Sequence, residues 1–73
     1  MQLLVVTRKS YHGYDAQVPS LGECETWGAT EDDALAGLME RVAYFLSLPA
    51  GFKHTLNLSG KENAEKTYTL TLP

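Results

Sequence analysis

The chain has 73 residues, 44% of them hydrophobic, with six basic and nine acidic side chains and a net charge of −3. This length allows a single domain, residues 1–73, and the apolar fraction is that of a globular protein rather than a disordered one. The acidic balance disfavours direct nucleic-acid binding, and the single cysteine, Cys24, excludes a disulfide within the monomer.

The first predicted element is a strand over residues 2–9. It contains a continuous apolar run, Leu3 to Val6, which is typical of a strand covered on both faces or of one at a subunit contact. The run is too short for a membrane span or a signal peptide. We therefore expect a cytoplasmic protein without membrane contact.

A turn and two further strands follow. Residues 10–13 predict a turn in which Gly13 is free to adopt a positive φ. Residues 14–18 alternate in polarity, and the apolar side chains of one face are Tyr14, Ala16 and Val18. Pro19 ends this strand because it cannot donate to the ladder. After a short connection, residues 24–28 predict a third strand through their Thr and Trp content.

A helix is the most clearly marked element. Thr30 is a good N-cap, and Asp33 three residues later forms a weak capping box. The first turn is acidic, as the helix dipole favours, with Glu31, Asp32 and Asp33. An apolar stripe follows at helical spacing, formed by Ala34, Leu35, Leu38, Val42, Phe45 and Leu46. Gly37 leaves room for a strand or a second subunit, and Pro49 and Gly51 stop the helix.

Two more strands form a second predicted hairpin. Residues 52–59 alternate, which places Phe52, His54, Leu56 and Leu58 on one face. The polar residues 60–65 predict the turn, and residues 67–72 place Tyr68, Leu70 and Leu72 on one face. The order is β-β-β-α-β-β. We expect an α+β fold with a mainly antiparallel sheet of four or five strands and one helix packed on one face.

Residues 5–46 contain three short motifs in a fixed order along the chain. A Gly13-Tyr14 tip is followed by a block from Val18 to Thr30 and by a helix that opens with residues 31–35. This pattern resembles the HicB-like antitoxin domain family. The positions that match in register are Pro19, Leu21, Cys24, Thr26, Gly28, Thr30, Ala34 and Leu35. The resemblance implies a HicB-like, partial ribonuclease-H-like fold and a role in bacterial toxin–antitoxin systems, where the partner is a small basic HicA-type RNA-cleaving toxin.

The chain departs from the family pattern at two places. Gly22-Glu23 stands where the family has Pro-Gly. The sequence ends after one more hairpin, where the family usually has a C-terminal DNA-binding module, so we expect a short stand-alone or truncated HicB-like domain, and operator binding is not carried over. The matched positions also have structural interpretations. Gly28 supplies a bend or a positive φ before the helix, Thr30 caps the helix, and Cys24 is a small buried hydrophobe.

Groups that could carry chemistry are few. A two-metal nuclease needs converging carboxylates, but the first strand has none, and the next acid along the chain is Asp15. Cys24 with His12 or His54 would make a nucleophile pair, although no orienting group or oxyanion loop accompanies them. The same residues do not form a metal-binding motif. We therefore expect no enzymatic activity, no metal and no cofactor, with the nuclease as the least favoured alternative.

The contact residues are predicted from aromatic and acidic side chains. Trp27 is either a core residue or an exposed anchor, since Trp and Tyr are enriched at binding hot spots. The predicted partner-binding residues are Trp27, Glu31, Asp32, Asp33, Glu40 and Tyr44. The expected function is that of a non-catalytic, antitoxin-like protein-binding domain whose acids complement a basic toxin. The alternative is a stand-alone dimeric interaction or scaffold domain without a toxin. We expect a homodimer because the apolar first strand and the sheet edges need cover.

Overall fold

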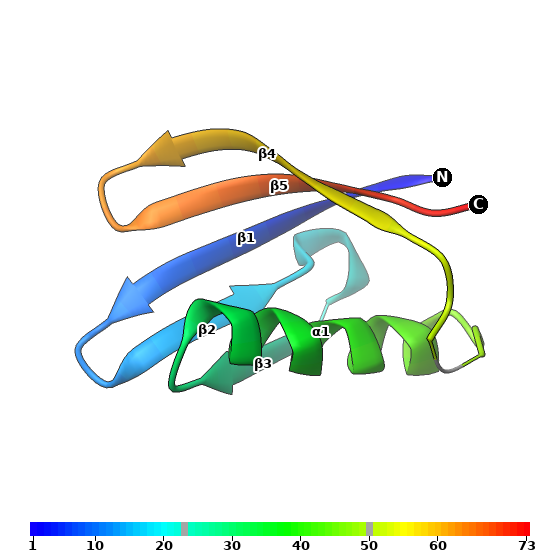
Figure 1. The fold of residues 1–73 in the computed structure, drawn as a ribbon, viewed down its shortest axis with the longest axis horizontal. Helices are drawn as coiled ribbons and strands as arrows, with labels where there is room; N and C mark the ends of the chain where they lie inside the picture. Colours follow the sequence, from blue (N-terminus) through cyan, green and yellow to red (C-terminus); the bar gives the residue numbers. More distant parts are fainter. Residues whose placement is uncertain (23, 50) are drawn as a thin grey trace.

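A computed structural model describes residues 1–22, 24–49 and 51–73 as one antiparallel sheet and one α-helix (Figure 1). The strands lie in the order β3-β2-β1-β5-β4. The elements in chain order are β1 (Gln2–Ser10), β2 (Gly13–Gln17), the short 3-10 helix η1 (Pro19–Leu21), β3 (Glu25–Gly28), α1 (Glu31–Phe45), β4 (Thr55–Glu62) and β5 (Glu65–Thr71). This confirms the expected α+β class and the order β-β-β-α-β-β. Glu23, expected in the connection before β3, lies outside the described residues.

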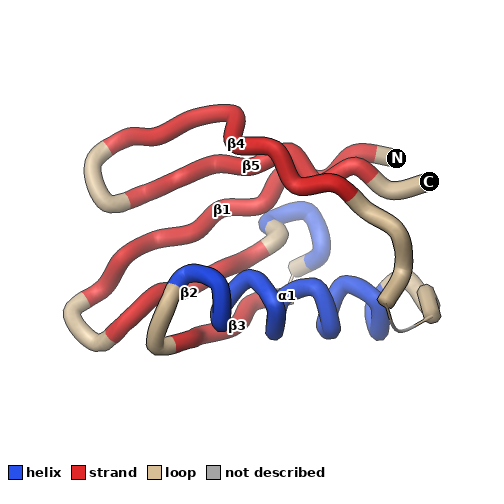
Figure 2. The backbone as a smooth tube through the Cα atoms, viewed as in Figure 1, coloured by secondary structure: helices blue, strands red, loops and turns tan. Residues whose placement is uncertain are grey.

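The helix covers only part of one face of the sheet. It packs mainly on β3 and β2, and the β4–β5 hairpin lies on the far side of β1 from it (Figure 2). The side chains of the core come from β1, β2, β5, α1, the residues directly after β2 and β5, and the residue directly before β3: Val5, Ala16, Val18, Cys24, Ala34, Leu38, Val42, Leu70 and Leu72. The predicted apolar faces of the second and last strands are therefore confirmed.

Among the described residues, no helix lies over the opposite face of the sheet, called the open face below (Figure 1). Strand β1 illustrates the difference between the faces, because Val5 is fully buried whereas Leu4, which points the other way, is 48% exposed. The expectation that β1 is covered on both faces is therefore wrong for the isolated chain. Period-2 alternation makes one face of a strand solvent-exposed when only the other packs on a helix.

The helix begins as predicted and ends earlier than predicted. Thr30 Oγ1 accepts a hydrogen bond from the Asp33 backbone N–H over 3.1 Å, which confirms the N-cap. The last helical residue is Phe45, and Ser47 then adopts a left-handed φ of 56°. The Leu48 N–H bonds back to the Ala43 carbonyl, which together with Ser47 forms a Schellman motif. The chain thus leaves the helix before Pro49 or Gly51, and Phe45 is 44% exposed rather than part of the core.

The second hairpin has different bounds from those expected. Strand β4 starts at Thr55 and continues through Gly60 to Glu62, so the turn contains only Asn63 and Ala64. A bulge between Leu58 and Gly60 shifts the register, and Leu58 is exposed. Bulges add a residue to one strand and break its alternation, which is why the simple alternating pattern misplaced the end of this strand. His54 precedes the strand and is exposed, not part of an apolar face.

Two glycines at the β2–β3 end are required by space or backbone geometry. Gly13 has a φ of 148°, which confirms the predicted positive value. Gly28 does not have a positive φ. A Cβ atom there would overlap the backbone nitrogen of Ala34, so Gly28 allows the start of α1 to lie directly on β3. Close approach of two backbones, not a bend or unusual φ, is therefore the reason for glycine at position 28.

Candidate protein-binding surface

Trp27 lies on edge strand β3 and is 57% exposed, so the core alternative for this residue is wrong. Together with residues of α1 it borders a shallow open groove, called the α1–β3 groove below. The residues that line it are Thr26, Trp27, Gly37, Glu40, Arg41 and Tyr44. The Trp27 indole lies beside Gly13 of β2, whereas Thr26 faces the helix, so Tyr44 is the aromatic side chain that α1 contributes to this groove. A shallow open surface of this kind is typical of a protein contact rather than of an enclosed small-molecule site.

The structure brings several predicted contact residues onto one side of the molecule. Trp27, Glu40 and Tyr44 border the same groove, and Tyr44 is 83% exposed. Asp32, Ala36, Glu40 and Tyr44 are all exposed and recur every fourth residue, so they form a single row along the helix, called the outer row of α1 below. Sequence reasoning missed Arg41, which lies one turn after Gly37 on the side facing β3.

Glu31 does not belong to this exposed surface. Its carboxylate accepts a hydrogen bond from the Thr7 hydroxyl over 2.8 Å at Oε2 and pairs with Lys66 over 3.3 Å at Oε1. Thr7 is buried, and the Glu31 side chain is itself largely covered. The prediction that Glu31 contacts a partner is therefore corrected: this acid joins α1 to β1 and β5.

The charges around Glu31 support one another. Burial opposes ionisation of Glu31, but hydrogen bonds from Thr7 and Lys66 outweigh it, and the pKa of the carboxyl is lowered. The same hydrogen bond and charge raise the pKa of Lys66. Burial, followed by the nearby Glu31 carboxylate, raises the pKa of Tyr68. The group is thus a structural ion pair with an ionised acid at neutral pH.

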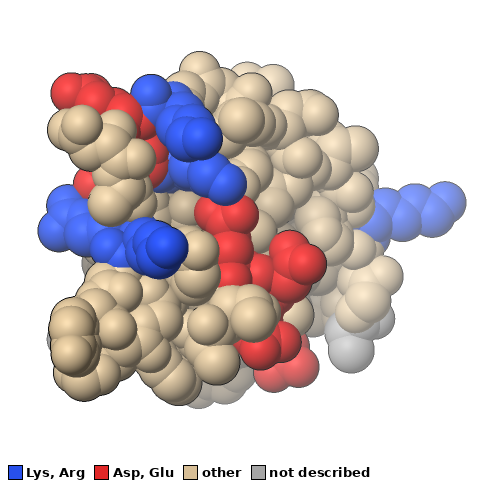
Figure 3. Space-filling model, turned by 60° about the vertical axis from the view of Figure 1, so that its left-hand side comes forward, with Lys and Arg blue, Asp and Glu red and all other residues tan. Residues whose placement is uncertain are grey.

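The remaining acids of the first helical turn, Asp32 and Asp33, are exposed. Figure 3 shows acidic side chains gathered on one face of the molecule with lysine and arginine side chains directly beside them. Lys66 and Glu31 are one such neighbouring pair. The acidic turn therefore has basic side chains beside it, and the exposed acids on the outer row of α1 are Asp32 and Glu40.

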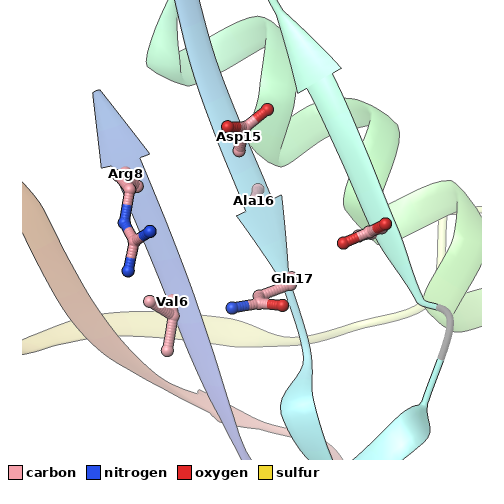
Figure 4. A pocket seen from close by; sticks show the side chains of 6 residues that line it. Val6, Arg8, Asp15, Ala16 and Gln17 are labelled. Carbon is pink, nitrogen blue, oxygen red and sulfur yellow. The ribbon is translucent and has the colours of Figure 1, made fainter. Parts of the chain in front are cut away.

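A second shallow hollow lies on the open face. It is lined by Val6, Arg8, Asp15, Ala16, Gln17 and Glu25, and Figure 4 shows Val6 and Arg8 on β1 beside Asp15 and Gln17 on β2. The Arg8 guanidinium binds Glu65 over 2.7 Å, and this hydrogen bond raises the pKa of Arg8. The hollow holds no nucleophile or histidine. Of its two acids, Asp15 lies opposite Arg8 of β1, and Glu25 lies opposite Gln17, on the far side of β2 from β1.

Within residues 1–22, 24–49 and 51–73, no group of three or more His, Cys, Asp or Glu side chains is placed to hold a metal ion. Cys24 is fully buried, and burial raises the pKa of its thiol, with Arg41 acting weakly in the opposite direction. His12 and His54 are both exposed. A neutral buried thiol is a poor nucleophile, so Cys24 fits the predicted role of a small core residue.

No family model, no curated protein and no solved structure matches this chain. Over the part of the chain that the structure describes, no helix is both long and apolar enough to cross a membrane.

Proposed function

We propose that this domain is non-catalytic and acts by binding another protein through the outer row of α1 and the adjoining α1–β3 groove. The observation that carries the proposal is the convergence of Trp27, Glu40 and Tyr44 on one exposed surface. Exposed Trp and Tyr side chains supply large contact areas at low entropic cost, and they are enriched among residues that dominate binding energy. Glu40, one helical turn before Tyr44 on the outer row, adds a charge that favours selectivity and speeds association.

The partner in this proposal is a small basic HicA-type RNA-cleaving toxin, so the function is antitoxin-like. The resemblance of residues 5–46 to HicB-like domains supports this choice. A net charge of −3 on this chain and exposed Asp32 and Glu40 on the outer row of α1 suit a basic partner. A domain with the proposed HicB-like fold would mask the toxin by contact and would need no chemistry of its own.

The test is an RNA-cleavage assay with a purified HicA-type toxin. Added wild-type chain should suppress cleavage at near-equal stoichiometry, and Glu40→Lys should weaken suppression by repelling the basic partner. Glu62→Lys is the matched control, since it makes the same charge change at the exposed end of β4. Failure of the wild-type chain to suppress cleavage, or equal loss in both variants, would contradict the proposal.

The second candidate function is a self-associating interaction or scaffold domain with no toxin partner. The free edge of β3 favours it, because an unpaired strand edge is a ready template for another strand. A gene for a small basic protein beside the gene for this chain would favour the antitoxin instead. Self-association without any effect on a HicA-type toxin would favour the scaffold.

A further inference from the structure

We propose that two copies of this chain associate by antiparallel pairing of their β3 strands. The hydrogen bond from the Val18 N–H to the Cys24 carbonyl, 3.0 Å long, shows how β2 and β3 are paired. Along an antiparallel ladder, hydrogen-bonded pairs alternate with pairs that share no hydrogen bond. Ala16 and Thr26, two residues further on, are therefore again a hydrogen-bonded pair, whereas Glu25 and Trp27 belong to the pairs without hydrogen bonds to β2. The backbone N–H and C=O groups of Glu25 and Trp27 therefore point away from β2, toward the free edge.

The other free edge of the sheet is less suited to pairing. Strand β4 contains a bulge between Leu58 and Gly60, and Lys61 follows it. Bulges and lysines are features by which edge strands avoid further pairing. Strand β3 pairs with β2 in unbroken register from Glu25 to Gly28 and has neither feature. The free edge of β3 is thus the available one.

The outward groups of β3 define a symmetric register. When a two-fold axis passes between the two copies of Thr26, Glu25 of each copy faces Trp27 of the other. The outward N–H and C=O groups of Glu25 then bond to those of Trp27 on the other copy, and the reverse, so every outward backbone group of the two residues has a partner. This register also keeps the two Glu25 carboxylates from facing each other directly, which would be repulsive.

The two-fold axis that relates the two β3 strands also passes close to the middle of α1. Gly37 lies over Thr26: a Cβ atom added to this glycine would be 3.7 Å from the Thr26 Cβ. The two-fold axis through Thr26 therefore brings the two α1 helices past each other, antiparallel, near Gly37. The space left by Gly37 lies against Thr26 of the same chain, so α1 sits close over the edge strand, and residue 37 adds no side chain between the two helices, which pack about 8–10 Å apart.

The charges on this side of α1 are self-complementary. Asp33 and Arg41 lie four residues before and four residues after Gly37, on the same row of the helix, and both are exposed. Antiparallel packing about Gly37 places Asp33 of one copy opposite Arg41 of the other, twice. A foreign strand would satisfy only the backbone of β3. A second copy pairs with the backbone of β3, packs at Gly37 and places an opposite charge beside both Asp33 and Arg41. We therefore infer that the occupant is a second copy of this chain.

This contact shares the α1–β3 groove with the proposed toxin surface, so a second copy and a toxin would compete for Trp27 and the side of α1 that faces β3. Asp32 and Ala36 on the outer row stay exposed in the dimer. The association is measured by sedimentation equilibrium of the purified chain alone, so its outcome is separate from that of the RNA-cleavage assay.

The first pair of variants is Glu25→Pro and Glu25→Ala. Proline removes an outward N–H that β2 does not use, and edge strands tolerate it, whereas alanine keeps the N–H. We expect wild type and Glu25→Ala to be dimers and Glu25→Pro to be a monomer. A wild-type chain that stays monomeric at all concentrations would overturn the proposal, even if the chain binds a toxin.

A charge-reversal set tests the same contact without altering the strand. Arg41→Glu should weaken the dimer on the order of tenfold or more by opposing Asp33 of the other copy, and the double variant Asp33→Arg/Arg41→Glu should restore it. If Glu25→Pro does not fold, these charge variants alone test whether the chain dimerises through β3 and α1. A dimer that is unaffected by Arg41→Glu, or a double variant as weak as the single one, would show that copies meet elsewhere.

Discussion

The Thr7 hydroxyl donates a hydrogen bond to Glu31 Oε2 over 2.8 Å and so joins the buried face of β1 to the first turn of α1. The two residues are 24 positions apart, and the same carboxylate also binds Lys66 of β5. A single acid thus connects three elements of the fold. Its loss leaves a buried hydroxyl and a lysine without their acceptor.

We expect Glu31→Ala to lower the free energy of unfolding by about 1–3 kcal/mol, the usual cost of leaving a buried polar group unpaired. Asp32→Ala is the matched control. Asp32 is exposed in the same helical turn, and its removal should cost only its interaction with the helix dipole, about 0.5 kcal/mol. Urea unfolding measures both values. Equal effects of the two substitutions would contradict the role assigned to Glu31.

The stability due to Glu31 should depend on pH in the acid range. Its pKa is lowered from the ordinary 4.5, so folding favours the ionised form. The contribution is fully present above pH 4.5 and is lost as the pH falls through the lower pKa of the folded state. The difference in unfolding free energy between wild type and Glu31→Gln should therefore shrink below this pH. A difference that stays constant down to strongly acid pH would oppose this assignment.

Ser47 ends the helix with a left-handed φ of 56°, a conformation that costs little only for glycine. We expect Ser47→Gly to raise the free energy of unfolding by about 1 kcal/mol, as read from the thermal midpoint. Ser20→Gly, at a position without positive φ, should instead lower it, because glycine gains more freedom in the unfolded chain. Stabilisation by both substitutions, or by neither, would argue against the Schellman geometry.

Gly28 is in contact with the backbone at the start of α1, and a methyl group there has no space. We expect Gly28→Ala to destabilise the fold by about 1–3 kcal/mol through overpacking. At Gly60, in contrast, an added Cβ would lie 3.8 Å from Thr67, an ordinary contact, so Gly60→Ala should be close to neutral or slightly stabilising. Chemical denaturation of the two variants compares them directly.

Local signals in the sequence were sufficient for much of the fold. The Thr30 cap, the break at Pro19 and the alternation of residues 14–18 each depend on neighbours along the chain, and the structure confirms them. The end of β4 was missed because a bulge interrupts its alternation. The early end of α1 was missed because Ser47 takes a conformation that sequence patterns assign to glycine.

The candidate surface was predictable only in part. Trp27, Glu40 and Tyr44 were recognised by residue type, but their meeting at one groove depends on how α1 lies on β3. Glu31 looked like its neighbours Asp32 and Asp33 in sequence. Only the position of Thr7 and Lys66, which approach it from two different strands, separates this acid from the others.

Binding of a toxin through the outer row of α1 is the central claim, and calorimetric titration of a HicA-type toxin into the chain tests it most directly. We expect saturable binding by wild type and a loss on the order of tenfold or more for Tyr44→Ala. Tyr11→Ala removes a tyrosine that is even more exposed, at the β1–β2 turn, and should leave the affinity unchanged. No binding by wild type, or equal affinities for both tyrosine variants, would contradict the claim.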